Sequence, residues 1–309
     1  MNRPFAVRVS NVSHSYGTHR ALDKVGFEVA PGEIFGLLGP NGGGKTTLFR
    51  ILATLLPIQE GTVEIDGHDA CSDVSGLRSR IGVVFQSPSL DIKLTVRENM
   101  IHHGHLYGLY GAALSAAVNE GLARIGLAER AADMVETLSG GLKRRVELAK
   151  GLLSEPSVLI LDEPSTGLDP GARRDLWAYL SALREERGTT ILVTTHLMEE
   201  AEHCDRLGIL DRGRIVSSGT ADTLRGKIGG DILTIRSTGA DALCAALNQR
   251  FSQEAEVIDG TIRLESPDAR HLIRQIYEAF PEQVDAISLG RPTLEDVFIH
   301  ETGHQFWNE

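Results

Sequence analysis

A glycine-rich segment ending in lysine and threonine is the first place where this chain combines residue types and spacing suited to chemistry. Gly39, Gly44, Lys45 and Thr46 match the pattern G-x-x-x-x-G-K-[ST]. The segment follows the apolar run 34–38 and precedes a predicted helix, so its backbone N–H groups and the positive helix end would surround a phosphate. A flexible glycine-rich turn is the alternative, but this strand–loop–helix order favours a phosphate-binding loop.

Each part of this loop has its own expected task. Lys45 should reach the β- and γ-phosphates of a nucleotide, and the Thr46 hydroxyl should bind Mg²⁺. Glycines at 42–44 let the backbone curl around the phosphate without side chains in the way. The predicted nucleotide contacts of the loop are Gly39, Pro40, Asn41, Gly42, Gly43, Gly44, Lys45, Thr46 and Thr47.

Two adjacent acids end a second apolar run, and they suggest how a bound nucleotide could react. Asp162 and Glu163 follow the run 158–161. A carboxylate at the end of a buried strand can hold Mg²⁺, directly or through water, which is the role expected for Asp162. Glu163 should point elsewhere and could polarise an attacking water as a general base. A pair of acids capping a strand at the surface is the alternative.

Short strands alternating with helices are expected to position these loops. Predicted strands cover 5–9, 25–29, 34–38, 61–67, 81–85, 158–161, 190–194 and 207–210. Helical patterns fill 94–136 and 172–186. This order predicts an α/β fold with a parallel sheet and a helical insertion at about 88–150.

A smaller unit is predicted after the flexible pair Gly229-Gly230. Its pattern reads strand, helix, strand, strand, helix, strand and a final helix, at 232–236, 240–251, 255–258, 261–265, 268–280, 284–289 and 294–300. This split-βαβ order predicts a small C-terminal α+β domain. The predicted domains are therefore 1–228 and 229–309.

Bulk composition limits the classes of function. The net charge of −11 over 309 residues argues against a nucleic-acid binder, which would carry a basic stripe. No stretch approaches the ~18 consecutive apolar residues of a membrane span. Work at a membrane would therefore need another chain to cross it. Three widely spaced cysteines fit a reducing compartment.

One more motif, Leu138-Ser139-Gly140-Gly141, lies between the phosphate loop and the acidic pair. The ordered set of motifs resembles the ATP-binding subunit of an ABC transporter over residues 5 to about 225. The resemblance implies a P-loop NTPase fold of the ABC ATPase type, in which a mixed sheet carries a helical subdomain. It also implies ATP and Mg²⁺ as ligands.

The resemblance assigns further roles to single residues. Tyr16 would stack on adenine, although a tyrosine at a sheet edge is the plain alternative. Gln86 would contact Mg²⁺ and the reacting water, unless it is an ordinary exposed glutamine. Ser139, Gly140 and Gly141 would grip the γ-phosphate of ATP held by a second subunit. Ser139 could equally be a simple helix N-cap, and both roles are compatible.

The resemblance also implies roles for Asp169 and His196. Asp169, in the loop 165–170, would link the two ATP sites across a dimer. His196, after the predicted strand 190–194, would hydrogen-bond the γ-phosphate and order the attacking water together with Glu163. A surface histidine without a role is the alternative for His196.

The chain departs from the family pattern at two positions. Leu142 stands where glutamine is usual, and leucine cannot make an amide hydrogen bond to the partner's nucleotide. Gly43 replaces a more usual alanine, which loosens the loop without changing its donors. Neither change removes the residues expected to perform hydrolysis.

Among ABC proteins, the sequence favours the ATPase of a transporter over a soluble factor acting on ribosomes or DNA. The chain has one ATP cassette and no long heptad insertion. The tail 291–298 resembles that of ABC-2-type exporter ATPases, which move drugs and lipids, and an importer ATPase is the alternative. The expected partners are an integral-membrane permease and a second copy of this chain, with no nucleic acid. The expected location is the cytoplasmic face of the membrane.

Overall fold

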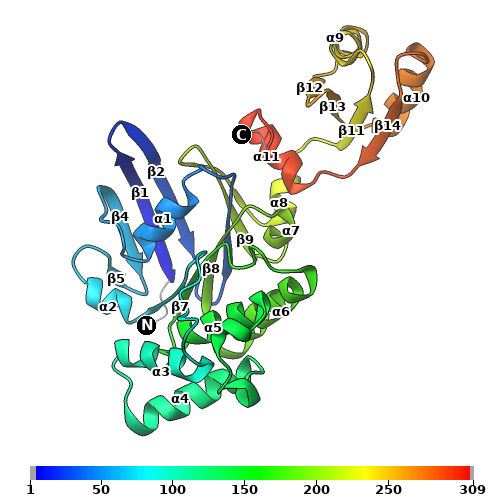
Figure 1. Ribbon diagram of the computed structural model, residues 1–309. Helices are drawn as coiled ribbons and strands as arrows, with labels where there is room; N and C mark the ends of the chain where they lie inside the picture. Colours follow the sequence, from blue (N-terminus) through cyan, green and yellow to red (C-terminus); the bar gives the residue numbers. More distant parts are fainter. Residues whose placement is uncertain (1–4, 307–309) are drawn as a thin grey trace. The chain divides into compact units, whose positions relative to one another are not determined.

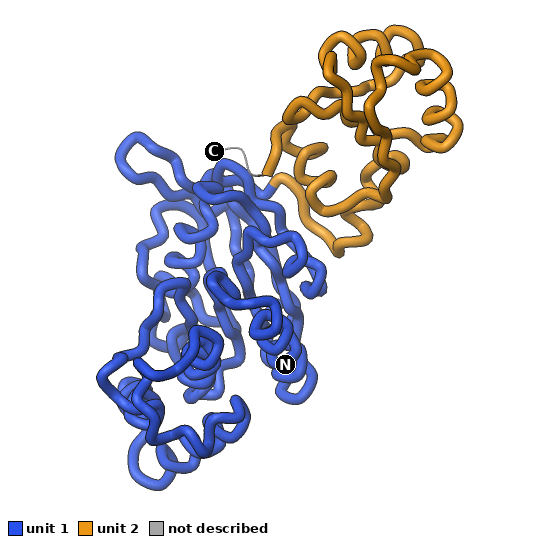
Figure 2. The backbone as a smooth tube through the Cα atoms, turned by 45° about the vertical axis from the view of Figure 1, so that its right-hand side comes forward, with its two compact units in different colours: residues 1–215 blue, residues 216–309 orange. Residues whose placement is uncertain are grey.

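The computed structural model describes residues 5–306 and divides the chain into two compact units (Figures 1 and 2). The division falls between Ile215 and Val216, before the sequence-based boundary at 228. The helix α8 (Ala221–Arg225) explains this difference, because it packs against the last helix, α11 (Leu294–Thr302). The short segment before Gly229 therefore belongs to the C-terminal unit.

A six-stranded sheet has the order β10-β9-β3-β8-β7-β6, and its strands from β9 to β6 form the centre of the first unit. Its strands are β3 (Ile34–Leu38), β6 (Ile81–Val84), β7 (Val158–Asp162), β8 (Thr190–Thr195), β9 (Arg206–Asp211) and β10 (Arg214–Gly219). The pairings from β9 through β3, β8 and β7 to β6 are all parallel. Every residue of β3, β7 and β8 is buried, which explains their continuous apolar runs. The predicted α/β class is confirmed.

A second sheet, antiparallel and in the order β2-β1-β4-β5, completes the mixed architecture. Its strands are β1 (Val7–Tyr16), β2 (His19–Val29), β4 (Glu60–Ile65) and β5 (His68–Asp69). One hydrophobic core joins this sheet to the helix α1 (Lys45–Leu52) and the central sheet. Within it, the rings of Phe27 and Phe35 stack with centroids 5.1 Å apart.

The region between β6 and β7 is helical and has a core of its own. It holds α3 (Val96–Leu106), α4 (Gly111–Arg124), α5 (Gly140–Gly151) and two short 3-10 turns, Ala128–Arg130 and Val135–Thr137. Thr95 and Glu98 form a capping box that starts α3. The remaining helices of this unit are α2 (Val74–Arg78), α6 (Pro170–Arg187) and α7 (Met198–Ala201).

The C-terminal unit has a four-stranded antiparallel sheet in the order β12-β13-β11-β14. Its elements are β11 (Asp231–Arg236), α9 (Ala240–Phe251), β12 (Glu256–Ile258), β13 (Thr261–Ser266), α10 (Ala269–Ala279) and β14 (Ala286–Gly290), followed by α11. Apolar residues of α9 and α10 form one core with β11 and β13. This is the split-βαβ arrangement expected from the sequence.

Candidate nucleotide-binding and hydrolysis site

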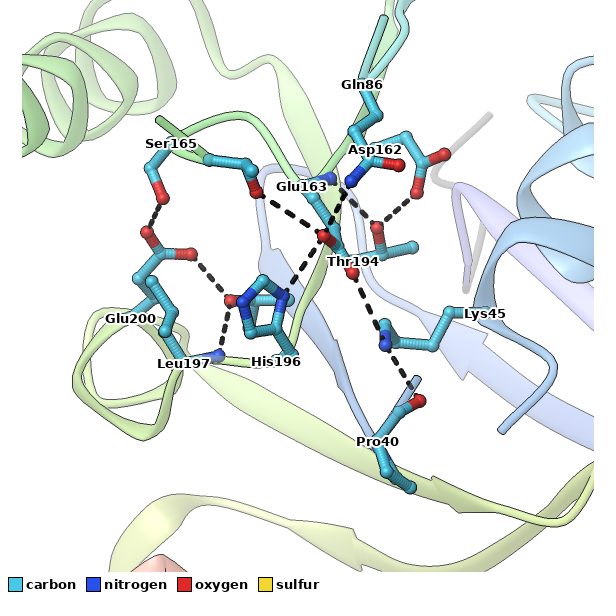
Figure 3. A network of polar contacts seen from close by, with 12 residues as sticks. Pro40, Lys45, Gln86, Asp162, Glu163, Ser165, Thr194, His196, Leu197 and Glu200 are labelled. Carbon is cyan, nitrogen blue, oxygen red and sulfur yellow. Dashed lines mark hydrogen bonds and ion pairs between the residues drawn. The ribbon is translucent and has the colours of Figure 1, made fainter. Parts of the chain in front are cut away.

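The carboxyl ends of four parallel strands meet at one edge of the central sheet, where α/β proteins bind their ligands. The predicted phosphate loop follows β3, Gln86 lies just beyond β6, Glu163 follows β7 and His196 follows β8. Segments far apart in the sequence are therefore brought together by strand order alone. Figure 3 shows the resulting contacts.

The loop after β3 needs glycine at both ends of its motif. A Cβ atom on Gly39 would lie 2.2 Å from the carbonyl oxygen of Leu210. Gly44, the N-cap of α1, has a φ of 106°, and a Cβ there would lie 2.7 Å from the Ala21 carbonyl oxygen. Only glycine accommodates both the close approach and the left-handed backbone. The loop thus passes directly into the N-terminus of a helix, as an anion site requires.

Lys45 is the buried cation of this loop, with a side chain only 4% exposed. Its Nζ donates to the carbonyl oxygens of Gly39 at 2.7 Å and Pro40 at 3.0 Å. The same atom lies 3.4 Å from Glu163 Oε1. Burial lowers the pKa of Lys45, and the neighbouring carboxylate of Glu163 opposes that shift. The ammonium group is therefore held between the loop and the predicted general base.

Glu163 is the centre of the polar network in Figure 3. Its Oε2 accepts from Gln86 Nε2 at 3.1 Å and lies 3.0 Å from His196 Nδ1. Its backbone is in the left-handed region, with a φ of 44°, which costs a residue other than glycine about 1–3 kcal/mol. Two hydrogen bonds from its N–H to the carbonyl and hydroxyl oxygens of Thr194 maintain this conformation. Three predicted catalytic residues are thus adjacent.

Asp162 turns away from Glu163 and accepts a 2.6 Å hydrogen bond from the Thr194 hydroxyl (Figure 3). The carboxyl is buried, and burial raises its pKa. Asp162, Gln86 and the exposed Thr46 can together offer carboxylate, amide and hydroxyl oxygen atoms. Oxygen donors of this kind fit Mg²⁺. Residues 5–306 hold no cluster of three or more His, Cys, Asp or Glu suited to a metal.

A pocket of about 290 Å³ opens over the loop. Its lining residues are Tyr16, His19, Ala21, Pro40, Asn41, Gly42, Gly44, Lys45, Thr46, Thr47, Gln86 and Glu163. Tyr16 is 45% exposed, so its ring is available to a planar ligand. A larger pocket, about 590 Å³, lies near the amino ends of the parallel strands and contains no predicted site residue. The predicted site residues therefore favour the smaller pocket as the nucleotide-binding pocket.

The Ser139 segment has a local structural role but does not line this pocket. Ser139 is the N-cap of α5, and its hydroxyl accepts from Leu142 N at 3.4 Å. Ser139 and Gly140 are exposed. The structure thus brings together all the predicted residues of one phosphate site except Ser139, Gly140, Gly141 and Asp169.

Asp169 is the N-cap of α6, a role that the sequence analysis missed. Its carboxylate accepts from the backbone N–H groups of Gly171 at 2.9 Å and Ala172 at 3.0 Å. These bonds lower the pKa of Asp169. The Asp-Pro pair at 169–170 is the sequence signal for such a helix start.

A buried carboxylate beside the site was also missed. Glu200 is 1% exposed, accepts from the Thr195 hydroxyl at 2.6 Å, and contacts the Ser165 hydroxyl. It thereby ties the loop after Glu163 to the end of β8, just before His196 (Figure 3). Burial raises the pKa of Glu200, and the Thr195 hydrogen bond and Arg173 partly oppose this shift. No local pattern marks Glu200, because its neighbour Glu199 is exposed and has the same side chain.

A phosphate-binding loop between a parallel strand and a helix, at the carboxyl edge of an α/β sheet, defines a P-loop nucleotide-binding protein. Residues 22–166 match the model of the family described as ABC transporter. The chain belongs to the ABC transporter family and is one of its ATP-binding subunits. Within residues 5–306, no helix combines the length and the apolar character needed to cross a membrane.

Similar proteins cover the chain almost from end to end. A daunorubicin resistance ATP-binding protein, DrrA3 of Streptomyces coeruleorubidus, is 38% identical, and the match covers 96% of each chain. A Nod factor export ATP-binding protein I of Paraburkholderia xenovorans is 40% identical over 97% of this chain and 98% of its own. The solved ATP-binding cassette MJ0796, a dimer bound to ADP and phosphate, is 29% identical with a TM-score of 0.62. That match covers 69% of this chain and 98% of the cassette.

The raised pKa of Asp162 leads to a prediction about stability. Asp162→Asn should raise the melting temperature of the nucleotide-free protein by about 2–4 °C near pH 8. The amide removes the cost of a buried charge while its Oδ1 still accepts the Thr194 hydroxyl. Since the folded chain holds this proton more tightly than the unfolded chain, the gain should shrink as the pH falls through the raised pKa.

Calorimetry of both proteins at several pH values measures this effect. Asp169→Asn is the matched control, because the carboxylate of Asp169 is stabilised in the folded chain and its amide should bring no gain. A melting temperature of Asp162→Asn at or below that of the original protein near pH 8 would contradict the prediction.

Proposed function

We propose that this chain binds MgATP, hydrolyses it to ADP and phosphate, and thereby drives a separate integral-membrane permease from the cytoplasmic face. One observation carries the catalytic part of the proposal. The carboxylate of Glu163 lies within 3.0–3.4 Å of atoms from Lys45, Gln86 and His196, at the mouth of the phosphate-loop pocket. These contacts support roles as a base for Glu163, a cation for Lys45 and orienting groups for Gln86 and His196.

Different residues of the loop and its neighbours would bind the phosphates, the adenine and Mg²⁺. Its N–H groups and the α1 N-terminus would surround the phosphates, and Lys45 would exchange its loop carbonyl partners for phosphate oxygens. Tyr16 would stack on the adenine. Thr46, Asp162 and Gln86 would hold Mg²⁺, which neutralises charge on the β- and γ-phosphates when bound.

Hydrolysis would then depend on the orientation of one water molecule. Glu163 would accept its proton as the oxygen attacks the γ-phosphorus and the bond to the β-phosphate oxygen breaks. The Nδ1 atom of His196 lies 3.0 Å from the Glu163 carboxylate. His196 would keep this carboxylate and the γ-phosphate in a fixed relative position. Gln86 would donate to the same Oε2 atom that His196 contacts, and Lys45 faces the other carboxylate oxygen, Oε1.

The exposed Ser139 segment supports a second part of the proposal. A serine hydroxyl and helix N-terminal N–H groups that are unused by the chain's own pocket would suit the γ-phosphate of another copy. A head-to-tail homodimer would then hold two ATP molecules, each between a phosphate loop and the partner's Ser139, Gly140 and Gly141. Asp169 would lie in the loop that connects the two sites. Closure and reopening of this dimer would move the permease between its two access states.

Export is the direction of transport that we propose. The tail 291–298 has the pattern of ABC-2-type exporter ATPases. The two similar chains over nearly the whole length carry names for drug resistance and for Nod factor export. The permease would supply the membrane-spanning helices.

Isolation of the tagged chain from solubilised membranes tests this function. We expect a polytopic membrane protein, identified by mass spectrometry, to co-purify with the chain, and the complex to hydrolyse ATP when Mg²⁺ is present. Lys45→Ala should weaken ATP binding and abolish measurable turnover, because the loop has no other cation to contact the phosphates. It should leave co-purification unchanged. Recovery of the chain only with ribosomes or DNA, or full turnover by Lys45→Ala, would overturn the proposal.

A further inference from the structure

One face of α5 buries three charged side chains. Arg144, Glu147 and Lys150 recur at every third position and are 8%, 5% and 9% exposed. Charged residues are almost never buried unless their charges and hydrogen-bonding groups are matched. On the same helix, Arg145 remains 40% exposed and pairs with Asp175 at the surface. The buried face therefore has a specific set of partners.

The Arg144 guanidinium holds two loops of the nucleotide site at once. Its Nη1 donates to the Phe85 carbonyl oxygen at 2.6 Å, and Phe85 directly precedes Gln86. Its Nε donates to the Pro164 carbonyl oxygen at 2.6 Å, and its Nη2 to that of Asp162 at 3.4 Å. Asp162 and Pro164 are the residues on either side of Glu163. The backbone around both Gln86 and Glu163 is thus bonded to one side chain.

The other two charged residues complete this attachment. Glu147 pairs with Arg144 at 2.7 Å and accepts from Ser89 N at 2.5 Å. Lys150 donates to the carbonyl oxygen of Ser89 at 2.8 Å and to its hydroxyl at 2.9 Å. The loop that carries Gln86 is therefore held to α5 at Phe85 on one side and at Ser89 on the other.

Arginine suits this task for a geometric reason. Its planar guanidinium presents five donors in a fixed fork, so it can serve several carbonyl oxygens in different directions. A lysine ammonium keeps the charge but has one nitrogen atom on a flexible stem. Buried ion pairs add little net stability on average, whereas they can specify one arrangement of the parts they join.

We propose that Arg144 is a positioning residue that couples the start of α5 to Gln86 and Glu163 of the same chain. Ser139 lies at the start of this helix, five residues before Arg144, or about 7.5 Å along the axis. The position of α5, set where Ser139 meets the partner's ATP, would therefore determine the geometry of the chain's own hydrolysis site. This inference rests on the proposed function, because it requires Glu163 to act in hydrolysis.

A pair of lysine substitutions tests the inference. Arg144→Lys should lower kcat by about tenfold to a hundredfold, since small displacements of catalytic groups have effects of this size. The KM for ATP should stay within about twofold, because Arg144 does not line the nucleotide pocket. Arg145→Lys, the matched control on the exposed face, should keep both constants. A residue with only a structural role would not separate kcat from KM in this way.

A second variant covers the case in which Arg144→Lys folds poorly. Arg144→Met combined with Glu147→Leu removes both charges of the Arg144–Glu147 pair together, which buried pairs tolerate better than the loss of one partner. This double variant should fold, bind ATP and show the same loss of kcat. Failure of both variants to fold would make Arg144 a structural residue and overturn the inference.

The remaining outcomes separate this inference from the proposed function. If the original protein hydrolyses ATP and Glu163→Gln does not, the proposed function stands. In that case, a kcat of Arg144→Lys within about twofold of Arg145→Lys, or a raised KM with an unchanged kcat, would overturn the inference alone. If the original protein shows no ATP hydrolysis in the complex with its permease, both are overturned.

Discussion

Glu163→Gln should bind ATP but turn it over about 10²–10⁴ times more slowly than the original protein. Glutamine has nearly the same shape, so contacts with Gln86 and His196 can persist. It has no carboxylate to accept the proton of the attacking water. The loss should therefore appear in kcat, with little change in ATP affinity.

The same substitution should reveal the dimer. If ATP joins two copies and hydrolysis separates them, a variant that cannot hydrolyse should accumulate as an ATP-bound dimer. Size-exclusion chromatography with light scattering, with and without MgATP, measures this. Glu199→Gln is the control, because its carboxylate is nearby on α7 but 87% exposed. Normal turnover by Glu163→Gln, together with a monomer in MgATP, would contradict the assignment of Glu163.

The parts of the site that the sequence predicted are those that follow buried strands. A continuous apolar run predicts a strand of a parallel sheet, and the residue that ends it must lie at the carboxyl edge. This reasoning places Lys45 and Glu163 at that edge, and the family resemblance adds Gln86 and His196. Their adjacency also requires that β3, β8, β7 and β6 are consecutive neighbours in the sheet, which the structure shows.

The parts that the sequence did not predict depend on distant partners. Arg144 looks like an exposed charge in the run 143–145, and its burial depends on carbonyl groups 20 and 59 residues away. Thr194 likewise orients both Asp162 and Glu163 across 31 or more residues. Such bonds form only once the strands are adjacent, so no local pattern signals them.

The limits of some strands and of the two units also depend on contacts between residues that are distant in the sequence. Strands β1 and β2 extend beyond the predicted runs at 5–9 and 25–29, because polar residues such as Ser13 and His14 are buried within the pairing. The C-terminal unit begins before residue 228, because Lys227 and Ser217 both bond to Glu301. Strand β13 of this unit was predictable from the sequence, because its buried and partly exposed residues alternate.

Mixing two inactive variants should restore activity if each ATP site is shared between two chains. Lys45→Ala disables the phosphate loop. Ser139→Asp keeps a good N-cap for α5 but places a negative charge against the partner's γ-phosphate. In the complex with the permease, a dimer of either variant alone would have two defective sites. A mixed dimer should contain one site with an intact loop and an intact Ser139 segment.

The ATP turnover that the mixture regains measures how many sites combine the loop of one chain with the Ser139 segment of the other. Random pairing makes half of the dimers mixed, each with one intact site, so up to about a quarter of the original turnover should return. A chain carrying both substitutions creates no intact site with either single variant, and its mixtures should stay inactive. Because Ser139 is exposed and outside its own chain's pocket, restored turnover can come only from the opposite copy. Mixtures of the single variants that stay inactive, or full activity of Ser139→Asp alone, would show that the site is complete within one chain.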